Sequence, residues 1–247
     1  MLKTLRRLLS RGAPPLETTA LQQWALERGH GWRRVRGAEG CVIDGRQGAV
    51  NWRIEWGAPQ RDYIAGQELR FIVELDLPQS LMCMVLNRTL MEAMEKAVYE
   101  HFVDEVQTRI DTDTPAEMRW LVMYSKLSNA EMGRLQERYG AVSSVAPWML
   151  QWLGSPLNDA LAVTIGPVPP EQPMVLTIGR GRLTLRTAMA QPDARQLAMW
   201  FSVFEHAMRE ALRLGSEWRD AAGALTTQPS AWERSELTKP GSLDEKR

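Results

Sequence analysis

The sequence predicts an α+β protein, with antiparallel strands forming one or more sheets and helices packed on one face. Two observations support this fold class. Apolar and polar residues alternate in 51–56 and 67–77, as in strands with one face in water. In 89–110 and 194–214, apolar residues recur at helical spacing instead. Strands and helices are segregated along the chain, which favours α+β over parallel α/β.

The first half of the chain reads mainly as strands. Residues 18–28 predict a short helix, followed by a strand over 32–36. Asp44-Gly45 is a tight-turn signal, and it predicts a hairpin between 41–43 and 49–56. The alternation in this segment places Trp52, Ile54 and Trp56 on one face. In the strand predicted over 67–77, the alternation turns Leu69, Phe71, Val73 and Leu75 inward and Arg70, Glu74 and Asp76 towards water.

The second half reads mainly as helices around one more hairpin. After the helix over 89–110, the apolar run 119–125 predicts a strand. Ser128 and Glu131 form a capping box, which predicts a helix to about Tyr139. The remaining predicted elements are two short helices over 147–153 and 156–162, a hairpin over 174–188 and a final helix over 194–214.

Length and composition predict three parts. Residues 1–15 form a basic amphipathic arm, and Gly12-Ala-Pro-Pro15 separates it from the rest. Residues 16–215 form a single α+β domain or, alternatively, two lobes over 16–114 and 115–215. Residues 216–247 are polar and weakly periodic, which predicts a largely disordered tail.

Charge is unevenly distributed in a chain whose formal net charge is zero. Residues 1–36 hold eight Lys and Arg against two Asp and Glu, a net of +6, so residues 37–247 carry −6. The arm, with Arg6 and Arg7 opposite its leucines, either contacts an anionic membrane surface or docks on the body. No apolar run is long enough to span a membrane. We therefore expect a cytoplasmic protein, or one that is peripheral at the inner membrane.

No motif for catalysis, a metal or a cofactor stands out. His30, His101 and His206 are far apart, and no nucleophile elbow or phosphate loop occurs. Cys41 and Cys83 lie in apolar runs, which predicts buried, reduced thiols. We expect no metal, no cofactor and a non-catalytic role. The alternative is an enzyme whose site is assembled from distant residues.

Two segments are candidate contact surfaces. The first combines aromatic and arginine side chains, the types that dominate interface hot spots: Trp52, Arg53, Trp56, Arg61 and Tyr63. A half-buried sheet face produces the same pattern. The second, over residues 28–36, interleaves arginines with a tryptophan as nucleic-acid binders do: Trp32, Arg33, Arg34 and Arg36. A strand with its arginines in water is the other interpretation, and the neutral net charge weakens the case for nucleic acid.

Residues 119–208 resemble a module of uncharacterised bacterial proteins, some of them membrane-associated. The resemblance rests on an apolar strand at 120–124, a helix opening at Ser128, a hairpin at 179–181 and a helix from Asp193. It covers a little over a third of the chain, implies a bacterial origin and a non-catalytic role, and carries no functional residue. Taken together, the sequence predicts an accessory or adaptor protein that binds another protein.

Overall fold

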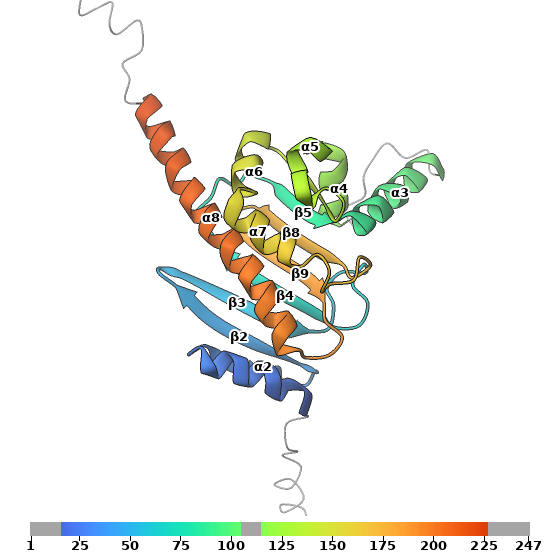
Figure 1. The fold of residues 1–247 in the computed structure, drawn as a ribbon, viewed down its shortest axis with the longest axis vertical. Coiled ribbons are helices and arrows are strands. Elements are labelled where there is room, and N and C mark those ends of the chain that lie inside the picture. The colour runs from blue at the N-terminus through green and yellow to red at the C-terminus, as the bar shows by residue number, and fades with distance from the viewer. Residues whose placement is uncertain (1–15, 105–114, 227–247) are drawn as a thin grey trace, which may run out of the picture.

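One antiparallel sheet organises the protein. The structure is a computed structural model, and it describes residues 16–104 and 115–226. Nine strands of these residues pair in the order β1-β2-β3-β4-β9-β8-β5-β7-β6 (Figure 1). Their bounds are β1 Gly31–Arg34, β2 Gly40–Gln47, β3 Val50–Gly57, β4 Glu68–Glu74, β5 Cys83–Asn87, β6 Ser125–Lys126, β7 Tyr139–Ser143, β8 Met174–Gly179 and β9 Arg182–Ala188. The predicted α+β class is confirmed.

The strand order joins both halves of the chain. Strands β1 to β4 form a meander, and β4 then pairs with β9 rather than with β5. Strand β5 lies between β8 and β7. Strands from before and after residue 114 therefore share one sheet.

Four helices cover one face of the sheet: α2 (Leu16–Glu27), α6 (Ala146–Trp152), α7 (Ser155–Val163) and α8 (Ala194–Thr226). Helix α8 crosses this face diagonally (Figure 1), and its Trp200, Phe204 and Met208 are fully buried. It also holds its neighbours: Phe201 packs on Trp24 of α2, and Trp152 of α6 donates its indole N–H to the carbonyl of Ala207 at 2.9 Å. Residues 216–226, predicted to be part of a disordered tail, continue α8.

The second face is covered only in part. Helices α3 (Arg88–Asp104) and α4 (Ala116–Met123) pack over β5, β7 and β8, where Met91, Met94 and Leu121 complete a second apolar cluster. Over β1 to β4 and β9, the same face carries mostly charged and polar side chains. No helix of the described residues is both long and apolar enough to cross a membrane.

The strand predicted over 119–125 is wrong, because most of that segment belongs to α4. Glu117 and Leu121, four residues apart, are buried, whereas Val122 and Met123 are exposed. This spacing is helical, but a short apolar run alone does not distinguish a strand from a buried helix. The capping box of Ser128 is confirmed. It opens only the short α5 (Asn129–Met132) and η1 (Gly133–Leu135), after which β7 begins.

The first hairpin turns later than predicted. Strand β2 continues through Asp44-Gly45, and the turn lies at Gly48-Ala49, where Gly48 has φ of 59°. Gly45 serves a different purpose: a Cβ built there would lie 2.1 Å from the ring of Trp52. Glycine is therefore required within the strand because a tryptophan ring lies across its backbone.

Replacing this glycine tests the packing. We expect Gly45→Ala to lower the free energy of unfolding by about 1–3 kcal/mol, because the methyl group forces the indole of Trp52 to move. The cost of the alanine should be smaller in a Trp52→Phe background, since phenylalanine lacks the outer ring atoms that clash. Urea unfolding of the two single variants and the double variant measures this. If Gly45→Ala lowers the free energy of unfolding equally in both backgrounds, the ring of Trp52 is not the reason why residue 45 is a glycine.

Candidate functional site

The first predicted contact surface is divided among separate places. Trp52 and Trp56 are 3% and 2% exposed and lie in the core beneath the helices, where the indole N–H of Trp56 donates to the carbonyl of Met189 at 2.8 Å. Arg53 points to the opposite face and pairs with Asp44 at 2.8 Å. The predicted alternation is correct, but the two tryptophans are part of a buried sheet face and are not available for contact.

Arg61 and Tyr63 belong to a third place, the connection between β3 and β4. Arg61 Nε lies 3.0 Å from Glu117 Oε1, and the Tyr63 hydroxyl donates to the same oxygen at 3.3 Å. Glu117 is 4% exposed. Burial, followed by the neighbouring Glu117 carboxylate, raises the pKa of Tyr63 well above its usual range. This cluster joins the connection to α4 and leaves none of its polar groups fully in solvent.

A larger buried ion-pair cluster lies beside it on the second face. Glu68, 1% exposed, accepts from Arg186 at 2.5 Å, from Arg70 at 3.3 Å and from the backbone N–H of Gln60 at 2.8 Å. Arg70 also pairs with Glu55. Arg70, predicted to face water, does point away from the core, yet it is only 8% exposed because its neighbours enclose it. Since every charge in this cluster is matched, we interpret it as structural.

The second predicted surface remains at the protein exterior. Arg33, Arg34 and Arg36 are exposed on and after β1, and Trp32 is half-buried against the core. Arg28, which begins the same predicted segment, is also exposed, and the structure adds two arginines from β2 and β3 that the local sequence pattern did not group with them, Arg46 and Arg53. Arg6 and Arg7 lie outside the described residues. We call the six described arginines the basic edge: Arg28, Arg33, Arg34, Arg36, Arg46 and Arg53.

The basic edge has few acidic neighbours. Asp44 pairs with both Arg33 and Arg53, and Glu27 lies 3.9 Å from Arg28. Among the described residues, Arg34 and Arg36 form no ion pair. Residues 28–54 contain six arginines against Glu39 and Asp44, a net of +4 in a chain that is neutral overall. The positive charge is therefore concentrated at one end of the sheet.

A cavity of about 470 Å³ lies within the basic edge, between Arg28 and Arg46. His30 lines it and packs edge-on against Trp52, with ring centroids 4.7 Å apart. Burial, and secondarily Arg28, lower the pKa of His30, so the imidazole is neutral at pH 7. The aromatic rings here pack on one another and on the core, so they do not form an exposed stacking platform.

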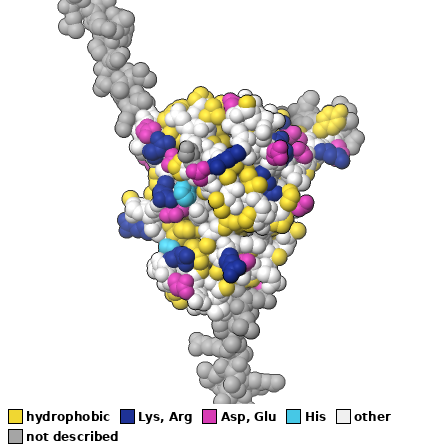
Figure 2. Space-filling model, viewed as in Figure 1, with side chains coloured by type: hydrophobic (Ala, Val, Ile, Leu, Met, Phe, Trp, Pro, Cys, Tyr) yellow, Lys and Arg dark blue, Asp and Glu magenta, His cyan; other side chains and the backbone are white. Residues whose placement is uncertain are grey.

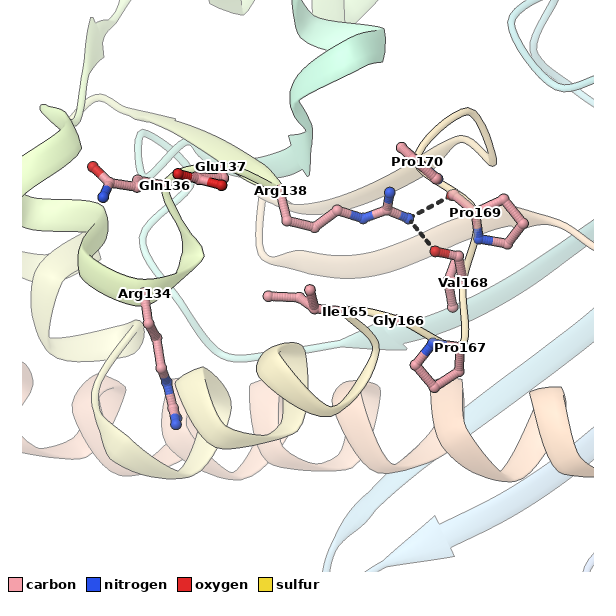
Figure 3. Close-up of a pocket in the computed structure, with 10 residues that line it drawn as sticks. All are labelled: Arg134, Gln136, Glu137, Arg138, Ile165, Gly166, Pro167, Val168, Pro169 and Pro170. Atoms are coloured by element: carbon pink, nitrogen blue, oxygen red, sulfur yellow. Dashed lines mark hydrogen bonds between the residues drawn. The ribbon is translucent and has the colours of Figure 1, made fainter.

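Figure 3 shows a second groove, with a volume of about 670 Å³. Its walls are the turn before β7 and the proline-rich segment 165–170. The guanidinium of Arg138 spans it and donates to the carbonyls of Val168 and Pro169 at 3.0 and 2.5 Å (Figure 3). Arg134 lies at the margin of the groove with its side chain directed away from Arg138 (Figure 3). It pairs with Asp159. Both arginines thus hold chain segments in place, and the groove lacks a concentrated charge.

Metal-binding side chains do not cluster in the part of the chain that the structure describes. No group of three His, Cys, Asp or Glu side chains there could hold a metal ion. Cys41 and Cys83 are both buried as free thiols, and His206 bonds through Nδ1 to the carbonyl of Ser202 at 2.7 Å. On the face that carries α6, α7 and α8, acidic and basic side chains are intermixed around an apolar band (Figure 2).

Comparisons with known proteins add little. No protein-family model matches the chain, and no curated protein matches it. Among solved structures, the mycobacterial trehalose monomycolate transport factor A, TtfA, is similar with a TM-score of 0.42 and 7% sequence identity. The match covers 79% of this chain and 92% of that one. A TM-score at this level supports no transfer of fold or function.

The buried ion-pair cluster makes a prediction about stability. We expect Glu68→Gln to lower the free energy of unfolding by about 3–5 kcal/mol, because it leaves Arg70 and Arg186 buried beside a neutral amide. Glu74, 63% exposed, pairs with Arg182 at the rim of the same face and is the matched control. Glu74→Gln should cost less than about 1 kcal/mol. Similar losses for the two variants in chemical denaturation would contradict the structural role of Glu68.

The buried thiols predict a loss of stability at alkaline pH. Burial raises the pKa of Cys41 from 9.0 to about 11 and that of Cys83 to about 12. The unfolded chain therefore releases these protons first, so the free energy of unfolding falls as the pH rises above 9. For Cys41, a shift of this size corresponds to about 3 kcal/mol, lost between pH 9 and 11. Urea unfolding across this range should show a shallower decline for Cys41→Ala, and parallel curves would contradict the prediction.

Proposed function

We propose that this protein is a non-catalytic adaptor that binds another protein through the basic edge. The observation that carries the proposal is the concentration of six exposed or partly exposed arginines at one end of the sheet, with a local net charge of +4. Such a surface attracts an acidic partner and orients its approach. Arg34 and Arg36 are central to the proposal because no acidic side chain of the described residues neutralises them.

The arrangement of the aromatic residues favours a protein over single-stranded nucleic acid. Non-specific binders of single strands combine a basic groove with aromatic rings on which bases stack. At the basic edge, Trp24 and Trp52 are buried and Trp32 is half-buried. The charge is present, but the stacking surface is not. To bind at the basic edge, an acidic protein segment requires only the positive charge and the backbone of the exposed strand β1.

Charge reversal tests the proposal. We expect Arg34→Glu/Arg36→Glu to remove a stoichiometric partner that the wild-type protein captures from a nuclease-treated native lysate. The control is Arg180→Glu/Lys96→Glu, which changes the net charge equally at two exposed positions outside the basic edge. We expect it to capture the partner as the wild type does. Quantitative mass spectrometry measures the bound fraction, and affinity should fall at least tenfold, about 1.4 kcal/mol, for the edge variant.

The competing partners give different outcomes. A captured component that disappears with nuclease treatment would replace the protein partner with nucleic acid. Co-sedimentation with anionic vesicles that Arg34→Glu/Arg36→Glu abolishes would replace it with a membrane surface, for which Arg6 and Arg7 precede α2 in the sequence. Equal capture by the edge and control variants would show that the basic edge is not the contact surface.

A further inference from the structure

The outer edge of β1 has backbone groups without partners among residues 16–104 and 115–226. Within this part of the chain, β1 is the first strand of the sheet and pairs only with β2. The backbone N–H of Val35 donates to the carbonyl of Gly40 at 3.1 Å, and the register runs through Arg33 opposite Val42. In an antiparallel pair, alternate residues bond across the ladder. Residues 31, 33 and 35 therefore bond to β2, while Trp32 and Arg34 direct their N–H and C=O groups outwards.

This edge lies within the basic edge defined above. Arg33 and Arg34 project from the two faces of β1, and Arg36 follows in the connection to β2. Strands at a sheet edge accept an extended peptide, in which main-chain hydrogen bonds provide affinity and side chains provide specificity. The side chains here are positively charged, so they specify an acidic chain.

The charge that attracts an acidic chain disfavours a second copy of this protein. If β1 paired with β1 of another molecule, arginines would stand beside arginines, and like charges opposite each other on adjacent strands are destabilising. Self-association through this edge is therefore blocked by the same residues. An acidic partner strand gains both ion pairs and hydrogen bonds.

We infer that β1 receives an extended acidic segment of a partner protein as an additional strand of the sheet. The inference rests on the proposed function and deepens it, because it specifies how the partner binds. Trp32, half-buried at the margin of the core, offers the incoming strand an apolar neighbour on the helix-covered face. Arg34, two residues further along β1, projects from the same face, and Arg36 follows in the connection to β2. The fitting segment therefore combines acidic residues with apolar ones.

The test uses a blocked peptide of four Glu-Val repeats and the same peptide N-methylated at each valine. N-methylation keeps the charge and removes alternate N–H donors. We expect the unmodified peptide to bind at least tenfold more tightly by fluorescence anisotropy. We also expect it to slow amide hydrogen exchange at Trp32 and Arg34 at least tenfold, without affecting Lys126 on β6 at the opposite edge.

A pair of variants provides a second measurement on the protein. Arg34→Ala removes only the charge, whereas Arg34→Pro also removes the outward N–H, which takes no part in bonding to β2. We expect weaker peptide binding by the proline variant than by the alanine variant. Proline is tolerated in an edge strand when its N–H would face solvent. If the proline variant does not fold, the affinities of the two peptides for the wild-type protein still test strand addition.

The outcomes separate the inference from the proposed function. Equal affinity for both peptides with unchanged exchange at Trp32 and Arg34 would overturn strand addition and leave a purely electrostatic contact. Tighter binding of an eight-residue oligothymidylate than of either peptide would overturn the protein partner itself. No binding of the peptide, with the lysate partner still dependent on Arg34 and Arg36, would overturn strand addition alone.

Discussion

The packing of α8 across the sheet is the interaction on which the rest of the fold depends. Its fully buried residues, Trp200, Phe204 and Met208, close the first face, and the same helix holds α2 through Phe201 and α6 through the carbonyl of Ala207. Burial of large apolar side chains contributes about 1.5–3 kcal/mol each. No other helix in the described residues joins elements from both ends of the chain in this way. The position of β1, and so of the basic edge, follows from the support that α2 receives.

The two faces of the sheet bury side chains of different kinds. The helix-covered face is apolar, and the indole N–H groups of Trp56 and Trp152 donate to the backbone carbonyls of Met189 and Ala207. Those of Trp24 and Trp200 are buried without a hydrogen-bond partner among the described residues. The other face, over β3, β4 and β9, matches charges instead, with Glu68 enclosed by Arg70 and Arg186. Matched charges leave no net field there. Arg34 and Arg36 of the basic edge differ from these paired charges, because they form no ion pair among the described residues.

Local patterns predicted what local interactions determine. The alternation in β3 and β4, the hairpin of β8 and β9 and the capping box of Ser128 depend on residues close in sequence, and the structure contains all three. Two features depended on distant partners and were missed. Gly45 looked like a turn residue because its role is set by the ring of Trp52 across the strand. The run 119–125 looked like a strand because its helical face appears only once the sheet is in place.

The candidate site could be predicted only in part, because some of its residues are adjacent in the sequence and others come together only in the fold. Arg33, Arg34 and Arg36 are adjacent in the sequence, and their exposure follows from their charge. Arg46 and Arg53 join them only through the pairing of β1, β2 and β3, which no single segment reveals. The aromatic residues of the first candidate surface were placed on the correct face, but their burial depends on α8, which lies more than a hundred residues further along the chain.

The pairing of β4 with β9 has a consequence for how the chain is made. The ion pairs that cross it, Glu74 with Arg182 and Glu68 with Arg186, join residues 108 and 118 positions apart. During synthesis, the meander of β1 to β4 is complete long before β9 leaves the ribosome. Until then β4, which carries Leu69, Phe71 and Val73, has no partner strand on its outer side. Contacts of such long range slow folding, and exposed strand edges promote aggregation in the interval. Efficient production of this protein therefore depends on how long the nascent meander stays protected.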